Sequence, residues 1–446
     1  MIRRALRARF LLPIASLGIT TWIVWWSVVN GRREQRLHRG LFLGAAPLVG
    51  RNEKDGWDWR FNWSLIGAGA LALVVVVACW RDWWTVLRLR WVIIASALGA
   101  TAFAVLLGLT DGLDGLTHGA ADKSEYLANL AKTPPAGEFV RRFLRDLNGY
   151  SVHVRGHPPG FVLVLKLLDN IGLRGVWPVV TFSIGGCGVL TAAVLLTVRT
   201  IAGDEWMRRA APFLIVAPYS IWMVTSGDSV FTAIGAVGVL AAAEGLRRTG
   251  RIALLLGLAS GLLLGFLLFL TYLGAIYLLL PTVIVVVAVI SHRRGAIPAI
   301  VGAVIAGLAV LIGFRLAGFW WFDGVDNTRQ QYLLGTAQFR KWSYFRFGNI
   351  GAALIVIGPV GVIGLATLRN RRLWLLIGAA CAGLLISHFS QYTKAEVERI
   401  WLLFYPWIAI AAAGLFVARR KWLMPTMVAA QAVFAILLQA ALVSKW

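Results

Sequence analysis

The sequence predicts an all-α polytopic membrane protein. Of its 446 residues, 59% are hydrophobic and only 14% are charged, and the mean hydropathy is +0.74. A soluble globular domain carries roughly 25% charged residues, so this chain lacks the surface charge of a soluble fold. Apolar runs near the length of about 20 residues that spans a bilayer recur along the chain. We therefore expect an integral membrane protein with many transmembrane helices.

Thirteen apolar segments are expected to cross the membrane. They lie at 10–29, 62–80, 91–110, 176–199, 209–226, 229–246, 252–269, 273–291, 297–315, 349–367, 373–388, 401–418 and 422–442. The first is expected to be a retained helix, because no convincing small-residue cleavage site follows it. The chain then divides into two N-terminal helices (1–90), a transmembrane core (91–420) and a C-terminal helix (421–446).

The basic residues predict the orientation. In a soluble protein the net charge of +24 would suggest nucleic-acid binding, but here the basic residues form short clusters between apolar runs. Such clusters are typical of cytoplasmic loops and of contact with anionic lipids, so we expect no nucleic-acid partner. Most clusters fall on one side, which is then cytoplasmic, whereas Arg32, Arg33, Arg36 and Arg39 fall on the other and are only partly offset by Glu34, Glu53, Asp55 and Asp58. The first two spans are therefore the least constrained.

The long polar segments fall on the opposite, outer face. The first of them opens with LTDGLDGLTHG, in which Asp111 and Asp114 directly follow a span. A spacing of three residues allows both carboxylates to face one cavity across a helical turn. A carboxylate at the membrane boundary suits a general base, although acids at this position also simply end helices. The spacing alone favours the second interpretation.

The stretch SVHVRGHPPGF follows an amphipathic segment whose apolar side chains, from Phe139 to Leu147, are expected to lie on the membrane surface. The two prolines predict a helix start, because the first helical turn needs no backbone donors. His153, Arg155 and His157 precede that start at the membrane interface and suit a phosphate near lipid headgroups. For a single cation, interfacial snorkelling is the ordinary alternative.

Two later outer segments repeat this combination of aromatic, basic and acidic residues. The positions of interest are Tyr344, Arg346, Lys394, Glu396, Glu398 and Arg399. An ordinary interfacial aromatic belt has a similar composition. Within the expected spans, almost no ionisable residue lies at mid-membrane depth, which disfavours an ion-coupled transporter. The three cysteines, Cys79, Cys187 and Cys381, lie in apolar runs and are expected to be inert, with no metal site.

Together these features resemble the GT-C membrane glycosyltransferases, over roughly residues 91–420. The resemblance rests on an acidic residue after an early span, an amphipathic first loop and a His-Pro-Pro helix entry. It also rests on PYSIWMVTSGDSVFTAIG, with Asp228 at its turn, and on EVERIWLLFYPW, which looks like that of actinobacterial members. Length and motifs are similar to the methylthioxylose transferases that act on lipoarabinomannan, with mannosyl- and arabinosyltransferases as close rivals.

The resemblance implies an enzyme of the plasma membrane without a cofactor. It would transfer a sugar from a polyprenyl-phosphate donor to a glycan or glycolipid on the outer face, with inversion. The base would be Asp111 or Asp114, and the donor phosphate would contact His153, Arg155, His157, Arg346, Lys394 and Arg399. Substrate contacts would involve Asp228, Tyr344, Glu396 and Glu398. The alternative is a flippase or transporter of lipid-linked glycans, for which internal repeats and paired broken helices are expected.

Overall fold

The computed structural model describes residues 2–38, 43, 57–415 and 421–443. Every secondary-structure element within these ranges is a helix, and the described residues form no strand beyond an isolated bridge between Trp57 and Leu442. Arg39, Glu53 and Asp55, which bear on the predicted orientation, lie outside the described residues. The prediction of an all-α chain is confirmed.

Among the described residues, ten helices are long and apolar enough to span a membrane. They are α1 (Ile2–Leu37), α2 (Trp63–Trp80), α4 (Leu89–Gly108), α9 (Val176–Ala202), α11 (Asp228–Gly245), α12 (Gly250–Leu270), α15 (Ala296–Leu316), α17 (Trp342–Thr367), α18 (Arg371–Ser390) and α21 (Leu423–Ala441). Each coincides with an expected span. The count rises to eleven if a bent pair, Val397–Leu403 and Tyr405–Leu415, forms one span, so it stays below the expected thirteen.

The remaining expected spans differ because their helices are interrupted or shorter. In 209–226, α10 (Asp204–Ile215) ends before Pro218, which starts the 3₁₀ turn η4 (Pro218–Trp222). The residue before a proline is pushed out of the helical region, and Ala217 is indeed extended. Almost all of this segment is buried in the bundle, where protein rather than lipid surrounds the irregular backbone.

The expected span at 273–291 is shorter than predicted, and the one at 401–418 is broken. The first consists of α13 (Gly274–Tyr277) and α14 (Leu279–Ile290), which together make a shorter apolar helix. The second bends by 79° between η6 (Trp401–Leu403) and α20 (Tyr405–Ala409), and continues as the 3₁₀ helix η7 (Ile410–Leu415). Pro406 lies in the first turn of α20, where its missing N–H costs no hydrogen bond.

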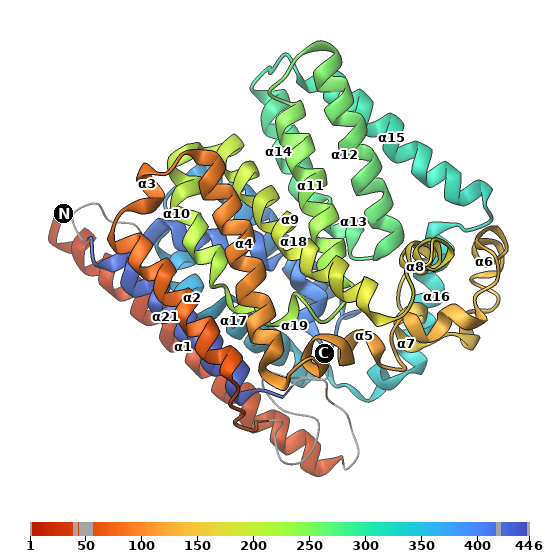
Figure 1. Cartoon of the computed structure of the whole chain (residues 1–446), viewed down its shortest axis with the longest axis horizontal. Helices are drawn as coiled ribbons and strands as arrows, with labels where there is room; N and C mark the ends of the chain where they lie inside the picture. Colours follow the sequence, from red (N-terminus) through yellow and green to blue (C-terminus); the bar gives the residue numbers. More distant parts are fainter. Residues whose placement is uncertain (1, 39–42, 44–56, 416–420, 444–446) are drawn as a thin grey trace.

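The N- and C-terminal helices pack on the core. Helix α1 lies along α17, and α2 lies beside α4 and α21 (Figure 1).

Helix α12 packs closely on α15. A Cβ at Gly257 or Gly261 would lie only 2.1 Å from a backbone oxygen of α15, so the two glycines permit this close contact. Small residues allow such close approach between membrane helices.

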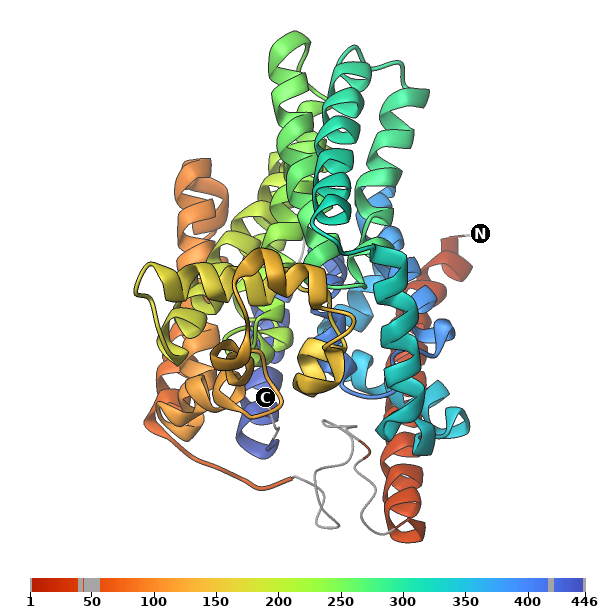
Figure 2. The ribbon, with the colours of Figure 1, turned by 90° about the vertical axis from the view of Figure 1, so that its right-hand side faces the viewer.

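The first long loop forms a group of short helices beside the bundle (Figures 1 and 2). They are η1 (Leu109–Asp111), α5 (Asp114–Ala121), η2 (Leu127–Lys132), α6 (Ala136–Arg142), η3 (Leu147–Gly149), α7 (Val152–Arg155) and α8 (Gly160–Asn170). Helix α16 (Trp321–Leu334), η5 (Thr336–Phe339) and α19 (Val397–Ile400) lie near them, whereas the turns α11–α12 and α14–α15 lie at the opposite end (Figure 1).

The amphipathic segment differs from the expectation in what it covers. Phe139 and Phe143 are buried, and their rings pack edge-on, with centroids 5.3 Å apart. Phe143 also stacks on Tyr150 and meets Phe319 edge-on. The apolar face of α6 therefore packs against protein, and it is not laid on the membrane surface.

Candidate functional site

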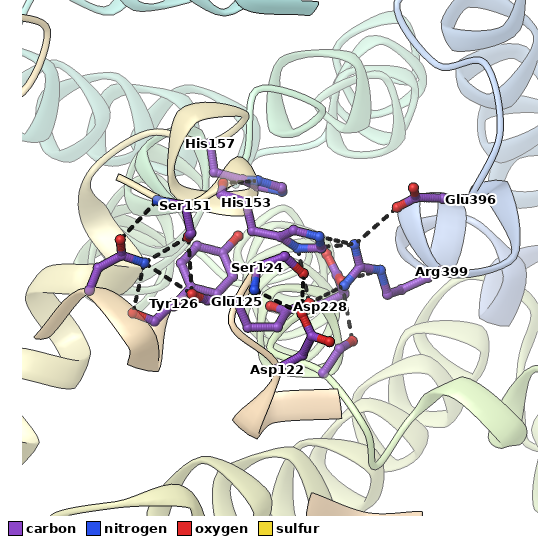
Figure 3. A network of polar contacts seen from close by, with 12 residues as sticks. Asp122, Ser124, Glu125, Tyr126, Ser151, His153, His157, Asp228, Glu396 and Arg399 are labelled. Carbon is purple, nitrogen blue, oxygen red and sulfur yellow. Dashed lines mark hydrogen bonds and ion pairs between the residues drawn. The ribbon is translucent and has the colours of Figure 1, made fainter. Parts of the chain in front are cut away.

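The centre of the candidate site is the guanidinium group of Arg399, which is surrounded by carboxylates (Figure 3). Its Nη1 lies 2.8 Å from Glu125 Oε1, its Nε 3.4 Å from Asp228 Oδ2, and its Nη2 3.6 Å from Glu396 Oε2. The ring of His153 lies beside the same guanidinium group, with Nδ1 3.2 Å from Nη2. His153 Nδ1 is also 3.0 Å from Glu125 Oε1. We call these five residues the Arg399 cluster.

Four segments that are far apart in the sequence build the Arg399 cluster. Glu125 lies in the turn after α5, His153 in α7, Asp228 at the first position of α11, and Arg399 in α19. The two first-loop segments are tied by backbone: the His153 N–H donates to the carbonyl of Ser124.

The buried side chain of Asn129 fixes the same part of the loop. Its Oδ1 accepts from the Ser151 N–H at 2.9 Å, and its Nδ2 donates to Ser151 Oγ at 2.7 Å. Ser151 Oγ in turn donates to the carbonyl of Glu125 at 3.0 Å. These bonds hold the backbones that carry Glu125 and His153 at a fixed spacing.

The charges of the cluster explain the ionisation of Glu125. Burial acts to raise the pKa of this carboxyl, but the neighbouring His153 and Arg399 outweigh burial and lower the pKa from 4.5 to about 2. Burial also raises the pKa of Tyr126 well above 10, and the charges of Asp228 and Glu125 add to that effect. Glu125 is therefore a stable anion and Tyr126 a neutral phenol at neutral pH.

A strained turn presents Glu396 to the cluster. Ala395 and Glu396 both have left-handed backbones, with φ of +87° and +56°. Such residues cost of order 1–3 kcal/mol each and persist where the surrounding structure holds them. Asn349 Oδ1 accepts from the Ala395 N–H at 3.1 Å, and the Tyr332 hydroxyl accepts from the Lys394 N–H at 2.8 Å. Strain of this kind is concentrated at functional sites.

Carboxylates surround the guanidinium group of Arg399 on every nitrogen. Each of its three guanidinium nitrogens has a carboxylate within ion-pair distance. A phosphate would have to compete with three anions for this one cation. Arg399 thus holds Glu125, Asp228 and Glu396 together, and its direct contact with the donor phosphate stays a prediction.

The HPPGF stretch packs behind the cluster. The helix starts at Gly160, directly after the proline pair, as expected. A Cβ at Gly160 would lie 2.3 Å from the carbonyl oxygen of Phe269, so only glycine permits this contact. Phe161 packs edge-on against Tyr126, with ring centroids 4.9 Å apart. His157 is half-buried, and burial lowers its pKa below 6.5.

The two candidate bases occupy different environments. Asp111 ends η1 and forms an ion pair with Arg60, and its side chain is 39% exposed. Asp114 lies in the first turn of α5 and is exposed, and its carbonyl accepts a hydrogen bond from His118 Nδ1 at 2.8 Å. The carboxylates therefore do not share a partner, and Asp111 is the one held by a cation.

The other expected site residues are dispersed around the cluster. Arg155 is half-buried in α7, and Arg346 is exposed on α17 with its guanidinium over Phe347. Lys394 donates to the carbonyl of Ala337 at 3.0 Å.

Two expected substrate contacts are instead buried in packed surroundings. Tyr344 stacks on Trp26 of α1, and Glu398 is fully buried in α19. A substrate would have to displace packed side chains to reach either residue. Direct contact of either residue with a sugar stays a prediction.

Sequence reasoning missed three charged residues of the site. Glu125 lies in KSEYLANL, and nothing in that text separates it from neighbouring surface charges. Arg60 lies in a loop whose excess of basic residues was used only to predict the side of the membrane on which the loop lies. Arg340 is buried, with Nη2 3.7 Å from Glu396 Oε1. In the sequence, the signal that could have identified Arg340 is its position among aromatic residues.

No protein-family profile and no curated protein sequence matches this chain. Among the described residues, no group of three or more His, Cys, Asp and Glu side chains has an arrangement suited to a metal ion.

Proposed function

We propose that the chain is a multi-pass membrane glycosyltransferase of the GT-C type. It would transfer a sugar from a polyprenyl-phosphate donor to a glycan or glycolipid of the cell envelope, on the outer face of the plasma membrane. One observation carries the proposal: acidic, basic and imidazole groups from four distant segments meet at the end of the bundle where Asp111 follows a span. Such convergence is typical of a catalytic site built on a helical scaffold.

The chemistry would be a single in-line displacement. Asp111 would accept the proton of the acceptor hydroxyl, and the hydroxyl oxygen would form a bond to the anomeric carbon. The bond from that carbon to the phosphate oxygen would break, and its electron pair would leave with the lipid phosphate. Inversion of the anomeric carbon follows from attack on the face opposite the leaving group.

The leaving phosphate needs a cation that carboxylates do not already hold. Arg155 fits this requirement better than Arg399, because among the described residues it has no ion-pair partner. It lies two residues from His153 in α7. Arginine suits the planar, bidentate contact with phosphate oxygens.

The sugar would be a pentose such as methylthioxylose or arabinose, or a mannose, with lipoarabinomannan as an acceptor. This assignment comes from the resemblance of HVRGHPPGF and EVERIW to actinobacterial enzymes. No side chain of the Arg399 cluster distinguishes these sugars by itself.

A lipid-glycan flippase is the second candidate, and one observation favours it. The segment from Val397 to Leu415 bends by 79°, and it carries the buried charges Glu398 and Arg399 near its start. Broken helices with buried charges are common at transporter binding sites. The backbone strain at Glu396 and the presence of Asp111 beside a polar pocket fit the enzyme better.

One experiment separates the two functions. Purified protein in liposomes is supplied with radiolabelled polyprenyl-phosphate sugars and mannan acceptors. The proposal predicts label in the acceptor, which requires both substrates. Movement of intact donor between leaflets without any transfer would instead identify a flippase.

A further inference from the structure

A small polar pocket lies beside Asp111, separate from the Arg399 cluster. Its volume is about 20 Å³, and Arg60, Asp111, His118 and Thr225 line it together with Gln439. A water molecule needs about 10–15 Å³ measured in the same way, so the pocket has room for one hydroxyl group or one water and not for a sugar ring. The exposed side of Asp111 gives access from outside.

Two polar atoms at this pocket lack partners. Thr225 is only 5% exposed, and its Oγ1 has no hydrogen-bond partner among the described residues. The same holds for Arg60 Nε. A buried polar group without a partner costs about 1–3 kcal/mol, which is a cost that a bound hydroxyl would remove. His118 donates its Nδ1 hydrogen to a carbonyl oxygen, so in the neutral ring Nε2 is an acceptor.

The guanidinium group of Arg60 fixes Asp111 against the C-terminal helix. It pairs with the Asp111 carboxylate and donates to the carbonyl oxygens of Gln439 and Leu442, at the end of α21. The Arg60 N–H also donates to the Ala440 carbonyl at 2.7 Å. One side chain thus links the last carbonyls of α21 to the carboxylate that ends η1.

Glycine residues bring α5 close enough to complete the pocket. A Cβ at Gly115 would lie 2.0 Å from the carbonyl oxygen of Gly108, and one at Gly119 would lie 2.4 Å from that of Thr225. Neither glycine has the left-handed backbone of Gly112, so their role is close approach rather than a turn. The pocket is therefore built by packing that larger residues would prevent.

We propose that this pocket receives the reacting hydroxyl of the acceptor, and that Arg60 is the positioning residue that aims Asp111 at it. The inference rests on the proposed transferase function and deepens it. The hydroxyl proton passes to Asp111 as the oxygen bonds to the anomeric carbon, and Thr225 Oγ1 hydrogen-bonds to that oxygen. The acceptor is thus an alcohol whose ring stays outside the pocket.

The sharpest test is Thr225→Val, which removes one hydroxyl and keeps the shape of the side chain. Because that hydroxyl is unpartnered, the variant should melt at or above the wild-type temperature. The KM for the acceptor should nevertheless rise about 2- to 10-fold, as loss of one hydrogen bond predicts, while the KM for the donor stays unchanged. Thr117→Val on α5 is the matched control, since Thr117 Oγ1 donates to its own helix.

Arg60 supplies a second, independent measurement. Arg60→Gln should lower kcat about 10²-fold with little change in the donor KM, and Arg60→Lys should restore part of that loss by keeping the charge beside Asp111. Wild-type protein that transfers no sugar would overturn the proposed function itself. Active wild-type protein, with unchanged acceptor KM in Thr225→Val and unchanged kcat in Arg60→Gln, would overturn this inference and leave the function standing.

Discussion

Replacing Arg399 by glutamine tests whether buried charge pairing holds the site together. The substitution removes the cation that pairs with Glu125, Asp228 and Glu396. The side chains of Arg399 and Glu125 are only 3% and 6% exposed, so water does little to screen their interaction. Removing one partner of a buried pair costs about 3–5 kcal/mol, because the other charge stays buried. We expect a loss of that size.

The loss is measured as a shift in the apparent melting temperature of the purified protein in detergent. For chains of 150–250 residues, 1 kcal/mol corresponds to about 2–4 °C, and a longer chain shifts less, so the drop should be no more than about 10 °C. Arg145→Gln is the control, because Arg145 forms an ion pair with Asp146 while its side chain is 67% exposed. Such surface pairs contribute about 0–1 kcal/mol.

A double variant tests whether Glu125 and Arg399 stabilise the protein by pairing with each other. Adding Glu125→Gln to Arg399→Gln removes a buried negative charge together with its partner. The double variant should therefore be less destabilised than the sum of the two single variants. Strict additivity, or an Arg399→Gln variant that melts like the wild type, would show that the pairing does not stabilise the protein.

Three further results are expected. Glu125 has a pKa of about 2 in the folded protein, against 4.5 for an ordinary glutamate. Its contribution to stability is therefore complete above pH 4.5 and is lost as the pH falls toward 2. The wild type should lose more thermal stability between pH 5 and pH 3 than Glu125→Gln. Gly160→Ala should lower the melting temperature, because its Cβ would meet a carbonyl oxygen at 2.3 Å, whereas Gly137→Ala, with nothing within 4 Å, should not. Asn349→Leu should reduce transfer by releasing the strained turn at Glu396, and retention of full activity would remove that turn from the site.

Much of the fold follows from hydropathy, because ten of the expected spans are helices long and apolar enough to cross a membrane. The exceptions are interrupted or shorter helices. The segment 209–226 is as apolar as a span, but Pro218 breaks it and the bundle buries it on all sides. Hydropathy measures only apolar content, so it does not separate a helix facing lipid from a broken segment inside the protein.

The site was less predictable because it depends on pairing across the sequence. His153, Asp228, Glu396 and Arg399 were expected near the site, and the structure brings them together. Glu125 is the partner that links His153 to Arg399, and the polar sequence around Glu125 gives no sign of this role. An arginine that looks available for phosphate in the sequence can be fully engaged by carboxylates in the fold, and only the contacts reveal this.

The most direct test of the central claim compares sugar transfer by Asp111→Asn and Asp114→Asn. Asparagine is nearly isosteric with aspartate and does not accept the proton, so a general base lost in this way typically costs about 10²–10⁴-fold in rate. We expect a loss of that size for Asp111→Asn, with donor binding retained, and a small effect for the exposed Asp114. Normal turnover in Asp111→Asn would contradict the account.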